Sequence, residues 1–95
     1  MSEEIKPLTN LLERLGFAHF INGTYSLFKI EHNMNHYYIR ISSDNDISLQ
    51  VLGSNDSADS KSYFVDNLSL NKSIEIIRAH FKKELRLLKI NKLLL

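Results

Sequence analysis

The C-terminal stretch Leu70–Leu95 constrains the fold more than any other part of the chain. It contains neither Pro nor Gly, the two residues least compatible with a helix interior. Its apolar residues recur at spacings of three, four and seven, as they do on the faces of a helix. The spacing predicts one long helix over residues 70–95, and the rest of the chain must supply a surface on which this helix packs.

At about 100° per residue, the apolar residues of this helix fall into two stripes on opposite sides. The first stripe consists of Leu70, Ile74, Ile77, Phe81, Leu85 and Leu88. The second stripe consists of Ile76, Ala79, Leu87, Ile90 and Leu94. A helix that lies on a sheet buries one stripe, and the wider first stripe is the better candidate for the core. The second stripe therefore needs cover from elsewhere.

We predict that the second stripe binds a protein partner, because exposed apolar patches of this kind usually mark interfaces. A second copy of the chain is the first candidate, since two-fold symmetry would bring the same patch against itself. The alternative is a monomer in which the N-terminal helix and the C-terminal tail cover both stripes.

The N-terminal part of the chain predicts a short helix over residues 7–15. Pro7 suits a first helical turn, and the four leucines of residues 8–15 share one helical face. Gly16 is placed to end the helix in a left-handed conformation. We expect Phe17, Phe20 and Ile21 to pack beneath this helix.

The middle of the chain predicts four antiparallel strands joined by polar turns. Aromatic and β-branched residues place the strands at 24–32, 36–42, 47–52 and 62–66. The predicted fold is a single α+β domain over residues 1–95, with a short N-terminal helix, a four-stranded antiparallel meander and a long C-terminal helix on one face of the sheet. Residues 1–5 are expected to be frayed, and residues 53–61 to form a flexible loop that has almost nothing apolar to bury.

The net charge of +1 conceals a marked asymmetry. Residues 1–67 hold five Lys/Arg and nine Asp/Glu, whereas residues 68–95 hold seven and two. A basic flank of the C-terminal helix consists of Arg78, Lys82, Arg86 and Lys89. Such a flank is able to follow a phosphate backbone, so nucleic-acid binding is the main alternative function.

Four strand tyrosines, predicted to be exposed, add to this alternative, and Tyr38 with Arg40 would offer a stacking surface. These are Tyr25, Tyr37, Tyr38 and Tyr63.

No sequence pattern points to an enzyme, a cofactor or a metal. His32 and His36 flank a short loop, but zinc requires three or four ligands. The acidic turn around Asp44 and Asp46 lacks the Gly and Glu of a calcium loop, and the chain has no Cys. There is no apolar run long enough to span a membrane and no signal peptide, so we expect a cytoplasmic protein.

The order of a short helix ended by Gly, a strand meander and a helix is similar to small dimeric secretion chaperones. Residues 11–16 (LLERLG), followed by strands at 24–32, 36–42 and 47–52, carry this likeness, although the final helix is basic where that family's is acidic. The resemblance implies a dimeric, non-enzymatic protein-binding function. We predict a protein-protein interaction module, homodimeric through the C-terminal helix, of the inhibitor, immunity or adaptor type; a secretion-chaperone-like role is a further alternative.

Overall fold

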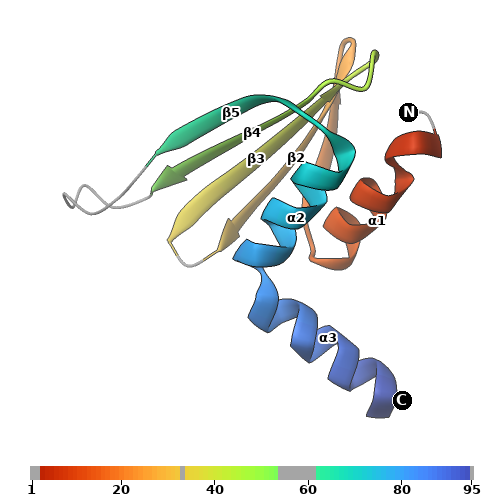
Figure 1. Ribbon diagram of the computed structural model, residues 1–95. Helices are drawn as coiled ribbons and strands as arrows, with labels where there is room; N and C mark the ends of the chain where they lie inside the picture. The colour runs from red at the N-terminus through yellow and green to blue at the C-terminus, as the bar shows by residue number, and fades with distance from the viewer. Residues whose placement is uncertain (1–2, 33, 54–61, 95) are drawn as a thin grey trace.

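The computed structural model describes residues 3–32, 34–53 and 62–94, and only the backbone of residues 3, 63 and 89–94. It has one antiparallel sheet with helices on one face (Figure 1). In chain order the elements are η1 (Glu3–Ile5), α1 (Lys6–Arg14), β1 (Ala18–Asn22), β2 (Tyr25–His32), β3 (Asn35–Ser42), β4 (Ile47–Gly53), β5 (Tyr63–Leu68), α2 (Leu70–His80) and α3 (Lys82–Leu94). The α+β prediction is confirmed, with five strands where the sequence predicted four.

The sheet is a meander in which sequence order equals spatial order, β1-β2-β3-β4-β5. Alternate residues of each strand point to opposite faces, so one face is apolar and lies under the helices. Its central members, Phe28, Ile39 and Leu49, are at most 2 % exposed. The paired registers Phe28↔Ile39 and Ile39↔Leu49 align them in a row across three strands.

The N-terminal helix forms as predicted and packs on this apolar row. Leu8 and Leu12 are fully buried, and Gly16 ends the helix with a φ of 92°. Residues 3–5 of the segment expected to be frayed form a 3-10 turn, in which Ile5 is 2 % exposed. Most of the expected flexible loop, residues 54–61, lies outside the described residues.

Strand β1 was absent from the prediction. Phe17 is buried beneath α1 as expected, but the placement of the next two apolar residues there was wrong: Phe20 is 46 % exposed and Ile21 is 79 % exposed. The chain turns away from the helix and pairs antiparallel with β2 through a two-residue turn that begins at Gly23. Because β1 is an edge strand, the helix layer does not reach it.

The C-terminal helix is divided in two at Phe81, where one continuous helix was expected. Ser69 caps α2 by accepting a hydrogen bond from the Lys72 N–H at 3.1 Å. At Phe81 the backbone leaves helical geometry (φ −119°, ψ 31°). No Pro or Gly causes the bend. The Phe81 side chain is instead held in the core, 1 % exposed, and α3 leaves the body of the domain from this point (Figure 1).

Candidate functional site

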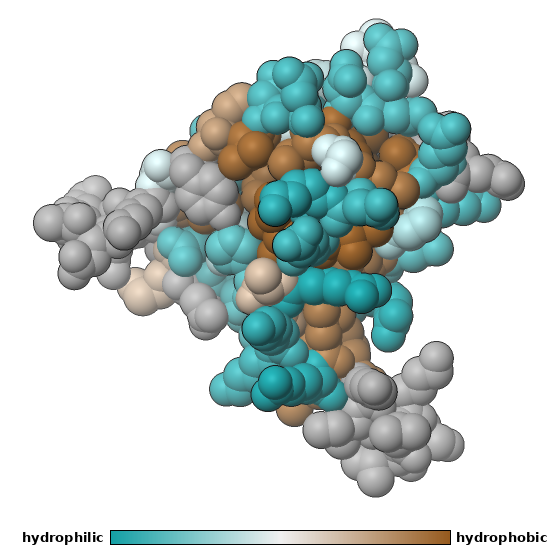
Figure 2. Space-filling model, viewed as in Figure 1, coloured by the Kyte–Doolittle hydropathy of each residue, from teal (hydrophilic) through white to brown (hydrophobic). Residues whose placement is uncertain are grey.

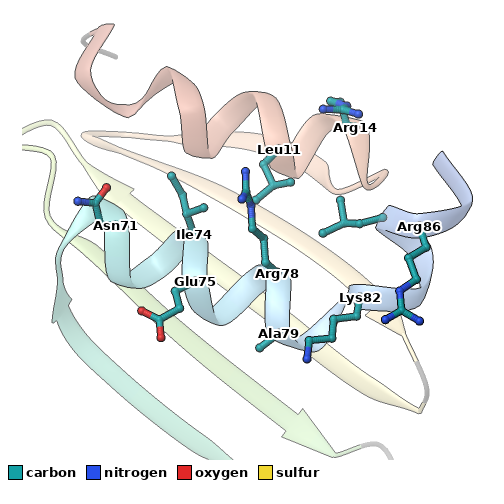
Figure 3. Close-up of a pocket in the computed structure, with 10 residues that line it drawn as sticks. Leu11, Arg14, Asn71, Ile74, Glu75, Arg78, Ala79, Lys82 and Arg86 are labelled. Carbon is teal, nitrogen blue, oxygen red and sulfur yellow. The ribbon is translucent and has the colours of Figure 1, made fainter. Parts of the chain in front are cut away.

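An open groove of about 1170 Å³ lies between α1 on one side and α2 with α3 on the other. Its apolar part is formed by Leu11 of α1, Ile74 of α2 and Leu85 of α3. Leu11 is buried, and the other two are half-buried against the core. Figure 3 shows Leu11 and Ile74 facing each other between the two helices. The groove therefore has an apolar floor that three separate elements supply.

Basic side chains from the same three helices surround this floor. They are Arg14, Arg78, Lys82 and Arg86, and all four are exposed. Glu75 is the one acidic residue among the described groove-lining residues, and its carboxylate lies 3.8 Å from Lys72 Nζ. The groove is therefore strongly positive at its rim.

The predicted basic flank is partly assembled in this groove. Arg78, Lys82 and Arg86 line it together, while the side chain of Lys89 lies outside the described residues. Arg14 joins them from α1, and sequence reasoning missed it. Only the placement of the C-terminal end of α1 beside α2 brings Arg14 to the groove (Figure 3).

The predicted partner-binding stripe is distributed over both C-terminal helices. Ile76 is half-buried against the core, and Ala79 lines the groove. Leu87 of α3 is 52 % exposed, and the side chains of Ile90 and Leu94 lie outside the described residues. In Figure 2 hydrophobic atoms lie along the first part of α3 between hydrophilic ones.

The junction between α2 and α3 is fixed by an aromatic cluster around Phe81. The Phe81 ring centroid lies 4.8 Å from that of His32, 5.1 Å from that of Tyr37 and 5.6 Å from that of Phe17. One turn later, Glu84 Oε1 lies 3.1 Å from His32 Nε2. The first turn of α3 is therefore joined to strand β2, and the remainder of α3 extends beyond it.

The His32–His36 pair does not form a metal site. His32 lies on the helix-covered face beside Phe81, whereas His36 precedes the buried Tyr37 and so points to the opposite face. Among the described residues there is no group of three or more His, Cys, Asp or Glu side chains arranged to hold a metal ion.

His80 lies at the end of α2 against the same cluster. Its Nδ1 is 3.4 Å from the Tyr37 hydroxyl, and the two rings meet edge to face at 5.4 Å. Desolvation lowers the pKa of His80, and it also raises the pKa of Tyr37. The neutral His80 tautomer without a proton on Nδ1 accepts a hydrogen bond from the Tyr37 hydroxyl, whereas a protonated Nδ1 cannot accept one.

We expect His80 to titrate below its value in the unfolded chain, which is about 6.5. The unfolded state then binds more protons, so the His80 contribution to stability is present above pH 6.5 and is lost as the pH falls below it. An NMR titration of the His80 ring in folded protein and in denaturant measures this difference. His80→Gln is the control, and it should remove the His80 contribution to the pH dependence of stability. Equal pKa values of His80 in the folded and unfolded protein would contradict its packing against Tyr37.

No helix in the described part of the chain covers the second face of the sheet, which presents aromatic and basic side chains. Lys29 Nζ lies 5.0 Å from the Phe20 ring centroid, and the Arg40 guanidinium lies 4.6 Å from that of Tyr25. Arg40 thus stacks on Tyr25, and Arg40 and the half-buried Tyr38 line one shallow pocket on the same face. The predicted stacking surface for nucleic acid stays a prediction.

The prediction that the strand tyrosines are exposed was wrong for the three whose side chains are described, Tyr25, Tyr37 and Tyr38. Tyr37 is 4 % exposed, because it faces the helix layer, so its placement at the surface was wrong. Tyr25 is half-buried on the open face, and the side chain of Tyr63 lies outside the described residues.

Comparison of the chain with protein-family models, with curated proteins and with solved structures finds no match. The resemblance to secretion chaperones stays a prediction. No helix in the described part of the chain is long and apolar enough to cross a membrane.

Proposed function

We propose that the protein is a non-enzymatic protein-binding module that self-associates through α3. The observation that carries this proposal is the course of α3, which is tied to the sheet in its first turn and then extends away from the domain (Figure 1). Isolated helices shorter than about 12–15 residues are marginal in water, and α3 has 13 residues. Packing against another chain would stabilise it.

A second copy of the chain is the partner that this helix suits best. Leu87 is the exposed start of an apolar series that the sequence continues with Ile90 and Leu94 at helical spacing. A two-fold axis beside α3 would place this series against its own copy, as isologous interfaces require. Burial of Leu87 at that interface would remove apolar surface from water.

Salt should strengthen this association. Helix α3 holds five Lys/Arg and one Glu, so two copies brought side by side repel each other. Salt screens exposed charges, with a Debye length of about 10 Å at 0.1 M. Pairing through apolar residues therefore tightens as salt is added, whereas binding of α3 to an acidic surface or to nucleic acid weakens.

Leu87→Glu should convert the self-associated protein to a monomer, because it would bury a carboxylate at the interface. Light scattering at tens of micromolar protein measures the change. Ile21→Glu is the matched control, since it makes the same chemical change at an exposed position on β1. The proposal fails if wild type is already monomeric, or if the two variants change the mass equally.

Nucleic-acid binding is the rival function, and one observation favours it. Arg14 joins Arg78, Lys82 and Arg86 around a single groove, which concentrates positive charge as a phosphate-binding surface does. The apolar floor of that groove favours a different ligand.

A further inference from the structure

We propose that the groove between α1 and α2–α3 is a binding site for an acidic amphipathic helix of a partner protein. This site is separate from the self-association of α3, because Leu87 is not among its described lining residues. Three properties of the groove suit such a helix: its shape, its apolar floor and its unneutralised basic rim.

The shape of the groove suits an elongated ligand. Its volume of about 1170 Å³ exceeds the roughly 300–1,000 Å³ of typical small-molecule pockets. Asn71 and Arg86 lie near its two ends (Figure 3). Along a helix these positions span at most about 22 Å, at 1.5 Å per residue. That length accommodates about four turns of a partner helix.

The floor of the groove selects for an apolar stripe. Leu11, Ile74 and Leu85 come from three helices and together form a strip along the groove. An amphipathic helix binds such a strip with residues at i, i+3, i+4 and i+7. A phosphate backbone would leave this apolar surface without an apolar partner, so the floor favours protein over nucleic acid.

The rim of the groove selects for negative charge. No ion pair within the described part of the chain joins Arg14, Arg78, Lys82 or Arg86 to a carboxylate. Glu75, the acidic member of the lining, is already close to Lys72. Charge complementarity at a rim steers the association of oppositely charged partners and disfavours partners of like charge. The basic α3 of a second copy is therefore excluded, whereas a helix flanked by Asp and Glu is favoured.

The uneven distribution of positive charge along the groove also predicts the orientation of the bound helix. Arg14 and Arg78 lie in the last turns of α1 and α2, and Lys82 and Arg86 lie just beyond them. The basic side chains therefore gather at the end of the groove nearest α3 (Figure 3). The C-terminus of a helix carries a partial negative charge, so the partner helix should place its C-terminal turn and its acidic residues at that end.

Fluorescence anisotropy with synthetic probes tests the proposal on the full chain. The first probe is a labelled helical peptide of about four turns, with Leu at i, i+3, i+4 and i+7 and Glu at the flanking positions. The second has the same composition in an order that destroys the apolar stripe. The third is a labelled oligothymidylate of similar length. We expect the first probe to bind at least tenfold more tightly than either of the others.

Charge reversal within the groove provides the second part of the test. Lys82→Glu and Arg78→Glu should each weaken binding of the first probe by about tenfold or more, because each replaces attraction to the carboxylates of the probe with repulsion across the rim. Lys83→Glu is the matched control, because it is the exposed neighbour of Lys82 and is not among the described lining residues. It should change binding by less than about threefold, the size of a screened surface charge effect.

Three outcomes would overturn the proposal. Equal binding of the striped and scrambled peptides would show that the apolar floor does not recognise an apolar stripe. Equal effects of Lys82→Glu and Lys83→Glu would show attraction to the overall charge rather than to the groove. Tighter binding of the oligothymidylate, lost in Arg78→Glu, would assign the groove to nucleic acid. Leu87→Glu should leave peptide binding unchanged, so failure of α3 self-association is distinguishable from failure of this site.

Discussion

Phe81→Ala should lower the free energy of unfolding by about 3–5 kcal/mol, the usual cost of removing a buried Phe. The Phe81 side chain is 1 % exposed and contacts the rings of Phe17, His32 and Tyr37. These partners belong to three different parts of the chain, so the cavity cannot close by movement of one element. Urea unfolding followed by circular dichroism measures the loss.

The same substitution should release α3 from the domain. Phe81 fixes the point at which α2 ends, and His32 contacts both Phe81 and Glu84. Hydrogen exchange of α3 amides should therefore accelerate more than that of the central strands. Lys83→Ala is the control, because Lys83 is exposed in the same helix and surface changes usually stay within about 0.5 kcal/mol. A loss below about 1 kcal/mol for Phe81→Ala would contradict the packing of Phe81 in the core.

Leu12→Ala should cost about 2–5 kcal/mol, as buried Leu-to-Ala changes do. Leu12 is fully buried and belongs to the core cluster beneath α1. Because α1 forms one wall of the groove through Leu11 and Arg14, its loosening should also weaken binding of the acidic amphipathic probe.

Glu13→Ala is the matched control for Leu12→Ala. Glu13 is exposed in the same helix, so its removal should leave stability within about 0.5 kcal/mol of wild type and leave probe binding intact. If Leu12→Ala destabilised the domain no more than Glu13→Ala, α1 would not be anchored as described.

The elements that the sequence predicted correctly are those with strong local signals. Gly16 ends α1 in the left-handed region as expected, because few other residues adopt that conformation readily. The alternating residues of the predicted strand 36–42 place Ile39 and Ile41 in the core, each 1 % exposed. The first stripe of the C-terminal helix also packs inward, with Ile77 and Phe81 each 1 % exposed.

Strand β1 shows where the interpretation of a local pattern was wrong. Residues 18–22 hold two large apolar side chains, which were assigned to the core because of their hydrophobicity. The Asn22-Gly23 pair after them is a hairpin signal, and a hairpin requires a strand before it as well as after it. Ile21 is exposed because β1 is at the edge of the sheet, and Phe20 is exposed because it lies on the face opposite the helices, beside Lys29. Both facts depend on the strand order and not on local composition.

The bend at Phe81 and the groove could not be predicted from one segment alone. Residues 79–83 contain no helix breaker, and the helical hydrogen bond from the Phe81 N–H to the Ile77 carbonyl is kept at 3.0 Å. The bend follows from the tertiary contacts of the Phe81 ring. In the same way, the basic flank was visible in the sequence, but its convergence with Arg14 depends on how α1 and α2 lie side by side.

Sedimentation equilibrium of the wild-type protein at tens of micromolar, in low and in high salt, tests self-association through α3 most directly. The chain has a mass of 11.0 kDa. We expect a species of twice that mass whose fraction rises with salt, because salt screens the repulsion between two basic helices. A mass of 11.0 kDa at both salt concentrations, or a dimer that dissociates as salt is added, would contradict it.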